Sequence, residues 1–266
     1  MKKIILCADD YGQSAAISAG ILHLIERGRL SATSCMTDSE FWSSTDNRLC
    51  EFRDRVDIGV HFNLTHELPA QTIPAQSLSV ILRTALMGRI DKKAIASTLN
   101  NQLDRFEKVM GQAPDFVDGH QHVHVFPGIR SVVLQQLAQR YKAKKPYLRA
   151  VNPRLPGHGG LLKLAFLKLL SSGFSSAAAR LNMSTNSGFA GIYSLQPQQN
   201  FALLMKNWMH EVRDGDLLMC HPGFLDSASD DPIAATRPLE LAFLQSAEFE
   251  NLLATTNVTL ARLRDR

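Results

Sequence analysis

The sequence predicts an α/β fold in which parallel strands alternate with helices, as an open sheet or closed into a barrel. Short apolar runs of four to eight residues alternate with longer segments whose apolar residues recur every three or four positions. The chain has 266 residues, of which 45% are hydrophobic and 20% are charged. Because barrel folds commonly use about 250 residues, we expect one domain that spans residues 1–266.

The elements follow from these patterns in chain order. We expect strands at residues 3–8, 33–36, 56–62, 115–118, 147–150, 217–220 and 257–260. We expect helices at residues 14–28, 91–110, 129–142, 198–213 and 238–254, and the first two show a clear apolar face. Since most strands are separated by a helix, a parallel sheet is the simplest arrangement.

A Pro- and Gly-rich stretch at residues 152–160 is expected to be a long loop, followed by a helix at residues 161–170 that is apolar around most of its circumference. We expect this helix to pack on the barrel or against a second subunit of a homodimer. The alternative is a cover over the site, or a contact for a hydrophobic part of the substrate, such as a lipid-linked sugar.

The first predicted strand stops at two adjacent carboxylates, Asp9 and Asp10. Two carboxylates at the mouth of a sheet repel each other and lose solvation, unless one binds a cation and the other can take up a proton. The alternative interpretation is a solvated turn that caps the next helix. In α/β folds the chemistry lies at the carboxyl ends of the strands, so the position favours a site.

Two further strands deliver histidine to the same edge. His61 lies in the strand at residues 56–62, where a lone histidine is otherwise a residue of the core or the rim. His221 follows the strand at residues 217–220 and precedes a Pro-Gly turn, where a general acid or base belongs; its alternative role is a histidine fixed by the turn backbone.

The segment from Asp118 to His124 holds three of the nine histidines within five residues: His120, His122 and His124. Imidazole is the commonest metal-ligating side chain, so the cluster favours a divalent ion over an exposed polar loop. His120 and His124 share a face in either a strand or a helix. Hydrolytic metal sites combine three such ligands with an open position for water.

These residues carry a resemblance to the YdjC/ChbG family of carbohydrate, chitooligosaccharide-type deacetylases. The matching segments occur in the family's order: Ala8–Gly12, Gly59–Thr65, Asp118–His124, His221–Gly223 and Arg237–Leu241. The resemblance spans residue 3 to about residue 250, is weak over residues 150–185, and departs at Gln121, where some relatives carry another histidine. We expect that departure to alter the pocket and leave the metal unchanged.

The resemblance implies a distorted (β/α) barrel, similar to a TIM barrel, with the active site at the C-terminal ends of the strands. It implies a divalent metal held by Asp10, His61 and His120, with Asp9 as base and His221 as acid. It suggests Mg²⁺; the mixed donor set leaves Zn²⁺ or Mn²⁺ open.

The remaining polar residues of the His-rich segment are expected to lie around the metal ligands. Asp118 shares strand parity with His120 and is placed to orient an imidazole; His122 and His124 are assigned to the pocket or to groups behind the ligands.

The expected function is removal of an N-acetyl group from an N-acetylated amino sugar, in an oligosaccharide or a glycolipid, by metal-activated water. The alternatives are a metal-dependent hydrolase of another bond, such as a phosphoester, and a non-catalytic carbohydrate-binding protein. A phosphatase usually has more positive charge or a second metal, and a binding protein needs neither Asp9 nor His221.

Charge and composition exclude several other classes. The net charge is +4, and the one dense basic run, Lys142–Lys145, is interpreted as a solvated helix end, so nucleic acid is not expected. The four cysteines show no CxxC spacing, which argues against a sulfur metal site. No apolar stretch is long enough to span a bilayer or to form a signal peptide, so we expect a cytoplasmic protein.

Overall fold

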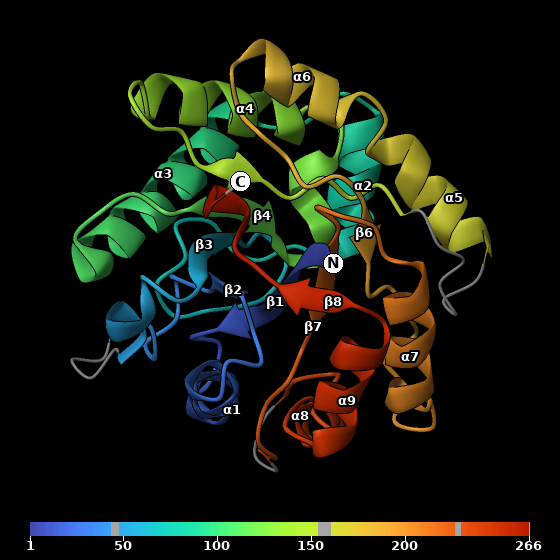
Figure 1. The fold of residues 1–266 in the computed structure, drawn as a ribbon. Coiled ribbons are helices and arrows are strands. Elements are labelled where there is room, and N and C mark those ends of the chain that lie inside the picture. Colours follow the sequence, from blue (N-terminus) through green and yellow to red (C-terminus); the bar gives the residue numbers. More distant parts are fainter. Residues whose placement is uncertain (44–47, 154–160, 227–229, 266) are drawn as a thin grey trace.

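A computed structural model describes residues 1–43, 48–153, 161–226 and 230–265, and its centre is one curled sheet of parallel strands (Figure 1). The strands are β1 (Lys2–Tyr11), β2 (Ala32–Cys35), β3 (Asp57–Phe62), β4 (Phe116–Gly119), β5 (Tyr147–Leu148), β6 (Phe189–Ala190), β7 (Leu217–Cys220) and β8 (Val258–Leu260). Their order is β5-β4-β3-β2-β1-β7-β6, and β8 pairs with the start of β1. Every named pair is parallel, as predicted.

The curled sheet is a distorted barrel, and this confirms the expected fold class. The strands β5 and β6 lie at the two ends of the hydrogen-bonded order. Between them, the described residues form only isolated parallel bridges, which pair Leu148 with Thr185 and Pro153 with Phe189. The described strands therefore pair along continuous ladders from β4 through β1 to β7, with one register shift between β1 and β2, and pair only at isolated bridges between β5 and β6.

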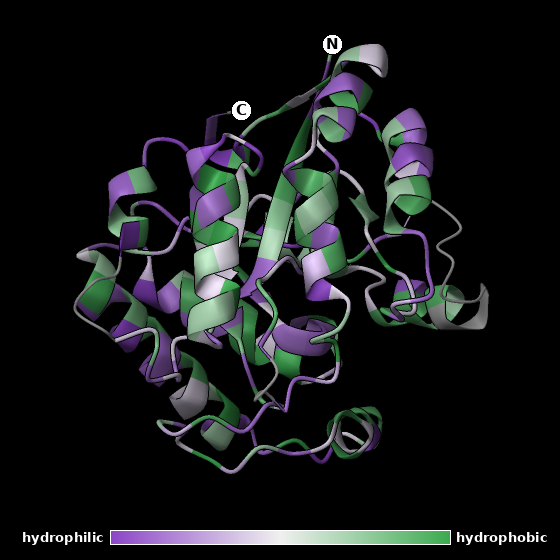
Figure 2. Cartoon of the chain, turned by 90° about the horizontal axis from the view of Figure 1, so that it is seen from below, coloured by the Kyte–Doolittle hydropathy of each residue, from purple (hydrophilic) through white to green (hydrophobic). Residues whose placement is uncertain are grey.

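Helices surround the sheet (Figure 1). They are α1 (Ala15–Glu26), α2 (Leu78–Leu86), α3 (Lys92–Met110), α4 (Ile129–Arg140), α5 (Leu161–Leu170), α6 (Phe174–Arg180), α7 (Phe201–Glu211), α8 (Arg237–Leu244) and α9 (Ala247–Thr255). Figure 2 shows that the central strands are mostly hydrophobic, whereas the surrounding helices carry both hydrophobic and hydrophilic stretches. The core therefore lies between the strands and the inner faces of the helices.

Local capping explains where several helices begin and end. The Ser14 side chain accepts a hydrogen bond from the backbone N–H of Ile17 at the start of α1. Asp91 does the same for two N–H groups of α3, and Gly111 ends that helix in the left-handed conformation, with φ of 70°. The helix predicted at residues 91–110 is thus bounded by the capping residues that its sequence contains.

The structure differs from the prediction in four places. The helix expected at residues 238–254 is two helices, α8 and α9, because Ser246 caps a new helix by accepting from the N–H of Phe249. Two short helices, α2 and α6, were not predicted, and neither was the two-residue strand β6. Elements this short contain too few periods for a reliable pattern.

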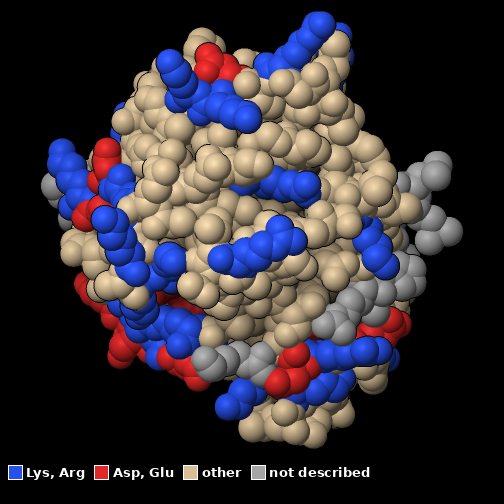
Figure 3. Space-filling model, turned by 90° about the horizontal axis from the view of Figure 1, so that it is seen from above, with Lys and Arg blue, Asp and Glu red and all other residues tan. Residues whose placement is uncertain are grey.

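The described helices include none that is long and apolar enough to cross a membrane. On the face seen from above, over α4 and α6, Lys and Arg side chains are separated by broad uncharged surface (Figure 3).

Candidate active site and metal centre

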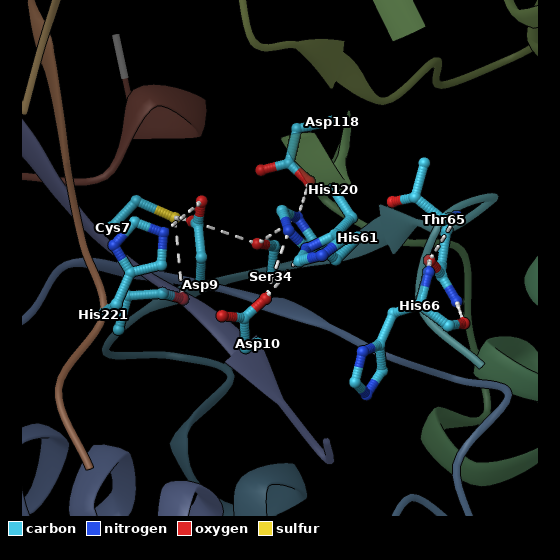
Figure 4. Close-up of polar contacts among 12 residues, drawn as sticks. Cys7, Asp9, Asp10, Ser34, His61, Thr65, His66, Asp118, His120 and His221 are labelled. Carbon is cyan, nitrogen blue, oxygen red and sulfur yellow. Dashed lines mark hydrogen bonds and ion pairs between the residues drawn. The ribbon is translucent and has the colours of Figure 1, made fainter. Parts of the chain in front are cut away.

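The residues predicted at the strand ends meet in one cavity of about 510 Å³. Its lining includes Asp9 and Asp10 from β1, His61 from β3, His120 directly after β4, and His221 directly after β7. Figure 4 shows these side chains pointing toward one another from their separate strands. Four segments that are far apart in the sequence thus supply one cluster of titratable groups.

A distortion of β1 allows two consecutive carboxylates to reach this cluster. In a regular strand Asp9 and Asp10 would point to opposite faces of the sheet. The register between β1 and β2 shifts between Ala8 and Tyr11, and Asp10 has φ of 72°. A positive φ is uncommon outside glycine and costs conformational energy, and such strain concentrates at functional sites. Both carboxylates are buried and line the same cavity.

A second irregular segment places His120. The residues His120–Val125 form a 3₁₀ segment in which Gln121 and His122 have φ of 52° and 61°. This segment is neither a strand nor an α-helix, so the expectation that His120 and His124 share a face is wrong. His120 turns toward Asp10, whereas His124 is fully buried, and its Nε2 lies 2.8 Å from the carbonyl oxygen of Arg149.

Asp10, His61 and His120 form a set of donors that fits a divalent cation. Their nearest ligand atoms all lie within 4.8 Å of one another. His61 Nε2 and His120 Nδ1 lie 3.4 and 3.3 Å from Asp10 Oδ1. That oxygen is buried and has no hydrogen-bond partner among the described residues. An unpaired buried carboxylate oxygen between two imidazole nitrogens is the arrangement that a cation would complete.

The other half of Asp10 is already engaged. Arg237, from the first turn of α8, donates from Nη2 to Asp10 Oδ2 at 2.8 Å. Burial alone raises the pKa of Asp10, but the charge of Arg237, followed by the contacts with His120, lowers it well below its usual range. Asp10 therefore stays ionised, with one oxygen fixed and the other open.

The imidazole of His61 is oriented by a carboxylate behind it. Asp118 Oδ1 lies 2.6 Å from His61 Nδ1, and the hydroxyl of Ser34 lies 3.0 Å from the same nitrogen (Figure 4). With Nδ1 engaged in this way, Nε2 is the ring atom that faces Asp10. Burial lowers the pKa of His61, but the surrounding carboxylates, above all Asp118, outweigh it and raise the pKa to about 9. The carboxylates around His61 therefore favour positive charge at its imidazole.

Asp9 has different surroundings from its neighbour. Arg149, fully buried, donates from Nη1 to Asp9 Oδ2 at 2.7 Å and from Nη2 to Asp9 Oδ1 at 2.5 Å. The same Nη2 lies 2.6 Å from Asp118 Oδ2. Burial raises the pKa of Asp9, but the charge and hydrogen bonds of Arg149 outweigh it and lower the pKa. One guanidinium thus compensates two buried carboxylates.

His221 lies opposite this pair and is held through its backbone. Its N–H donates to Glu240 Oε2 at 2.6 Å, and its Nε2 lies 4.0 Å from Asp9 Oδ2. Glu240 is fully buried and also accepts a hydrogen bond from the hydroxyl of Tyr193. Burial lowers the pKa of His221 to about 4, since the nearby carboxylates offset only part of this effect. The Nδ1 atom of His221 has no partner among the described residues.

The other residues expected around the metal separate into two groups. His122 lines the cavity together with Gln121 and packs edge-on against Phe189, with ring centroids 5.4 Å apart. His124 does not line the cavity, but its contact with the Arg149 carbonyl places it behind the residue that holds Asp9. The position expected for a pocket group therefore suits His122 and not His124.

Sequence reasoning missed the residues that compensate the buried charges. Arg149 and the pair Arg237 and Glu240 received no role, although the segment that contains the pair was noted. Arg149 lies at the carboxyl-terminal part of the strand predicted at residues 147–150, as His61 does in its own strand, so a search of strand ends for cations would have found it. Arg237 and Glu240 are three residues apart at the start of one helix, which places them on the same face.

The curled parallel sheet defines an α/β-barrel protein. Its titratable residues lie at the carboxyl ends of the strands, which is where enzymes with this fold have their active sites. The chain belongs to the YdjC-like protein family, whose sequence model matches residues 3–255. This confirms the resemblance that the motifs indicated.

Similar proteins agree with this assignment. Chitooligosaccharide deacetylases of Yersinia pestis and Yersinia pseudotuberculosis are 26% identical over 271 aligned positions, which cover 99% of this chain and 99% of each relative. A solved structure from Enterococcus faecalis, described as a cellobiose-phosphate cleavage protein, has a TM-score of 0.75 at 19% identity, over 99% of this chain and 98% of that one. A family 4 acetyl xylan esterase from Clostridium thermocellum, solved with a cobalt ion, has a TM-score of 0.51 at 11% identity, over 99% and 89%. At these identities the two structures show the fold alone.

The geometry of the three donors predicts which variants lose metal. His61→Ala and His120→Ala each remove one of three ligand atoms, so both purified variants are expected to lose the divalent ion. His122→Ala serves as the matched control and is expected to keep it, because His122 lies outside the set of donors. Elemental analysis of the three proteins after gel filtration checks this. Wild-type metal content in both His61→Ala and His120→Ala would contradict the assignment.

Proposed function

We propose that this protein removes an N-acetyl group from an N-acetylated amino sugar, using one divalent cation held by Asp10, His61 and His120. The observation that carries the proposal is the buried oxygen Asp10 Oδ1, which faces two imidazole nitrogens and has no hydrogen-bond partner among the described residues. The named activity of the Yersinia relatives, which align over the whole chain, supports the choice of reaction. The family resemblance favours Mg²⁺, and the mixed His/Asp donors also suit Zn²⁺ or Mn²⁺.

A cation bound to these donors supplies a Lewis acid for the acetyl carbonyl and lowers the pKa of water. The chain itself must then move a proton from the attacking water to the departing amine, because an amine leaves poorly as an anion. Besides the donors, the titratable side chains that line the cavity include Asp9, His66, His122, His221, Asp231 and Arg237. We assign the proton transfer to Asp9 and His221, because Asp9 Oδ2 and His221 Nε2 lie 4.0 Å apart.

Asp9 is proposed to accept the proton of water. It is ionised, and its two oxygens are fixed by the two Nη atoms of Arg149, so its orientation is set before substrate binds. The same contacts lower its pKa and make it a weaker base than a free carboxylate. Arg149 thus acts as a positioning residue whose charge also limits how long Asp9 keeps the proton.

His221 is proposed to deliver the proton to the amine. Its Nε2 lies 4.0 Å from Asp9 Oδ2, so a proton accepted at that oxygen has a short path to the imidazole. The backbone of His221 is fixed by Glu240, which leaves the ring at the cavity wall. A phosphoester substrate fits less well, because both arginines near the donors, Arg149 and Arg237, are already paired with carboxylates.

Acetate release tests the reaction directly. The protein is incubated with N-acetylated saccharides and glycolipids before chelation, after chelation, and after addition of single divalent ions. We expect acetate from at least one substrate, loss of release on chelation, and recovery with one added ion. Release of phosphate from phosphorylated sugars in place of acetate would overturn the proposal, and so would acetate release that is insensitive to chelation.

The two adjacent carboxylates are expected to separate by role. Asp10→Asn replaces an anionic ligand with a weakly binding amide, so it should lose metal affinity. Asp9→Asn should retain metal and lose turnover by about 10²–10⁴-fold, the range for loss of a general base. Metal content and acetate release are measured on both variants. If both bind metal normally and remain active, the pair is merely a turn.

His221→Ala is expected to bind metal and substrate but to turn over slowly. The defect should shrink on an activated aryl acetate ester, because its leaving group departs without a proton. The comparison is kcat for the amide and the ester in the variant and the wild type. An equal loss on both substrates would assign His221 to the oxyanion or to substrate binding, and unchanged kinetics would place the acid elsewhere.

A further inference from the structure

The cavity has a second region whose walls differ in chemistry from the cluster of titratable groups. Away from that cluster, apolar side chains from two helices form the lining. They are Leu78 and Leu82 from α2, and Phe166, Leu167 and Leu170 from α5. Figure 1 shows α2 and α5 on the same side of the barrel. A sugar hydroxyl pressed against such a wall would lose its hydrogen bonds to water without replacement, at a substantial cost in free energy.

Both apolar walls continue from the cavity onto the surface. On α2, Leu78, Leu82 and Leu86 are spaced four residues apart and so share one face, and Leu86 is 56% exposed. On α5, Phe166 lines the cavity at 39% exposure, and Leu169, three residues further on, is 72% exposed. Single exposed apolar side chains are common on protein surfaces. A contiguous apolar surface that continues a cavity is not, and such a surface marks a binding site.

The two helices that form these walls carry basic side chains but no acidic ones. The sequences of α2 and α5 contain no acidic residue, whereas Arg83 and Lys168 are exposed. An anionic group between a sugar and an apolar chain would therefore meet no repulsion from either helix. The cavity joins a polar end, suited to an acetamido group, to an apolar end that opens along two helices.

We propose that the substrate is an N-acetylated amino sugar joined at its reducing end to a long aliphatic chain, and that α2 and α5 bind the chain. This inference rests on the proposed function, since it places the sugar at the cluster formed by Asp9, Asp10, His61, His120 and His221. The polar end holds the acetamido group of the sugar, and the aglycone lies between Leu82 and Phe166. Beyond the cavity, the chain extends past Leu86 and Leu169.

The test compares the methyl, octyl and dodecyl β-glycosides of N-acetylglucosamine, each below its critical micelle concentration. Burial of one methylene is worth about three- to fourfold in affinity. We therefore expect kcat/KM for acetate release to rise by about 100-fold or more from methyl to octyl, mainly through KM. Equal values for all three glycosides would overturn the inference. So would a rise with the length of the N-acyl chain instead of the aglycone, measured with N-octanoylglucosamine.

Variants locate the effect. Leu82→Ser and Phe166→Ser are expected to reduce the octyl-to-methyl ratio by about tenfold each. Leu203→Ser on α7, which replaces a 54% exposed leucine that does not line the cavity, is the matched control and should leave the ratio unchanged. Because Leu82 is only half exposed, thermal unfolding is measured for each variant. Leu169→Ser, at a well-exposed position, should reduce the dodecyl advantage and spare the octyl one.

A binding measurement separates this inference from the proposed reaction. Calorimetric titration of the Asp9→Asn variant with octyl and methyl glycosides reports the preference for the chain without turnover. If no substrate yields acetate but the octyl glycoside still binds much more tightly, the reaction is wrong and the apolar site stands. If acetate is released equally well from methyl and octyl glycosides and binding is equal, the reaction stands and the apolar site is wrong.

Discussion

The site depends on the compensation of three buried carboxylates by two buried arginines. Asp9, Asp10 and Asp118 are each at most 2% exposed and lie close together, so they would repel one another strongly if they stood alone. Arg149 bridges Asp9 and Asp118, and Arg237 holds Asp10. Removing one partner of a buried ion pair typically costs about 3–5 kcal/mol, because the remaining charge is left uncompensated. The two arginines are therefore as necessary to the cluster as the side chains proposed to bind the cation or transfer the proton.

The two arginines are far in sequence from the carboxylates that they contact. Their ion pairs therefore also connect distant segments of the barrel. Arg149 follows β5, at one end of the hydrogen-bonded order of strands, and contacts Asp9 on the central strand β1. Its carbonyl accepts the contact from His124, so the irregular segment after β4 is tied to the same residue. Arg149 thus ties the end strand β5 and the segment after β4 to the central strand β1 through side-chain contacts.

Much of the site could be predicted from strand ends alone. The apolar runs of three strands stop at or next to Asp9 and Asp10, His61 and His221. In any parallel α/β sheet, polar residues at the carboxyl ends of strands lie along one edge, so these residues could be expected to meet. The geometry within the cluster could not be predicted. It depends on a register shift in β1, on positive φ at Asp10, and on two left-handed residues after His120, none of which has a signature in local hydrophobic pattern. The separation of His120 from His124 follows from that backbone path and not from their spacing.

The same limit explains why the compensating cations were missed. A lone arginine such as Arg149 in an apolar strand resembles an edge or surface residue, and its partner Asp9 lies 140 positions away. Arg237 likewise contacts Asp10 across 227 positions. Long-range pairing of this kind is set by the order of the strands in the sheet, which the sequence left open between an open sheet and a barrel.

The two arginines also explain how adjacent carboxylates can differ in chemistry. Arg149 donates hydrogen bonds to both oxygens of Asp9, so that side chain is fixed and anionic. Arg237 engages one oxygen of Asp10 and leaves the other facing His61 and His120. Asp9 and Asp10 are chemically identical side chains. They differ in that Arg149 donates to both oxygens of Asp9, whereas Arg237 donates to one oxygen of Asp10. This difference supports the proposal that the cation binds at Asp10 and that Asp9, whose Oδ2 lies 4.0 Å from His221 Nε2, transfers the proton.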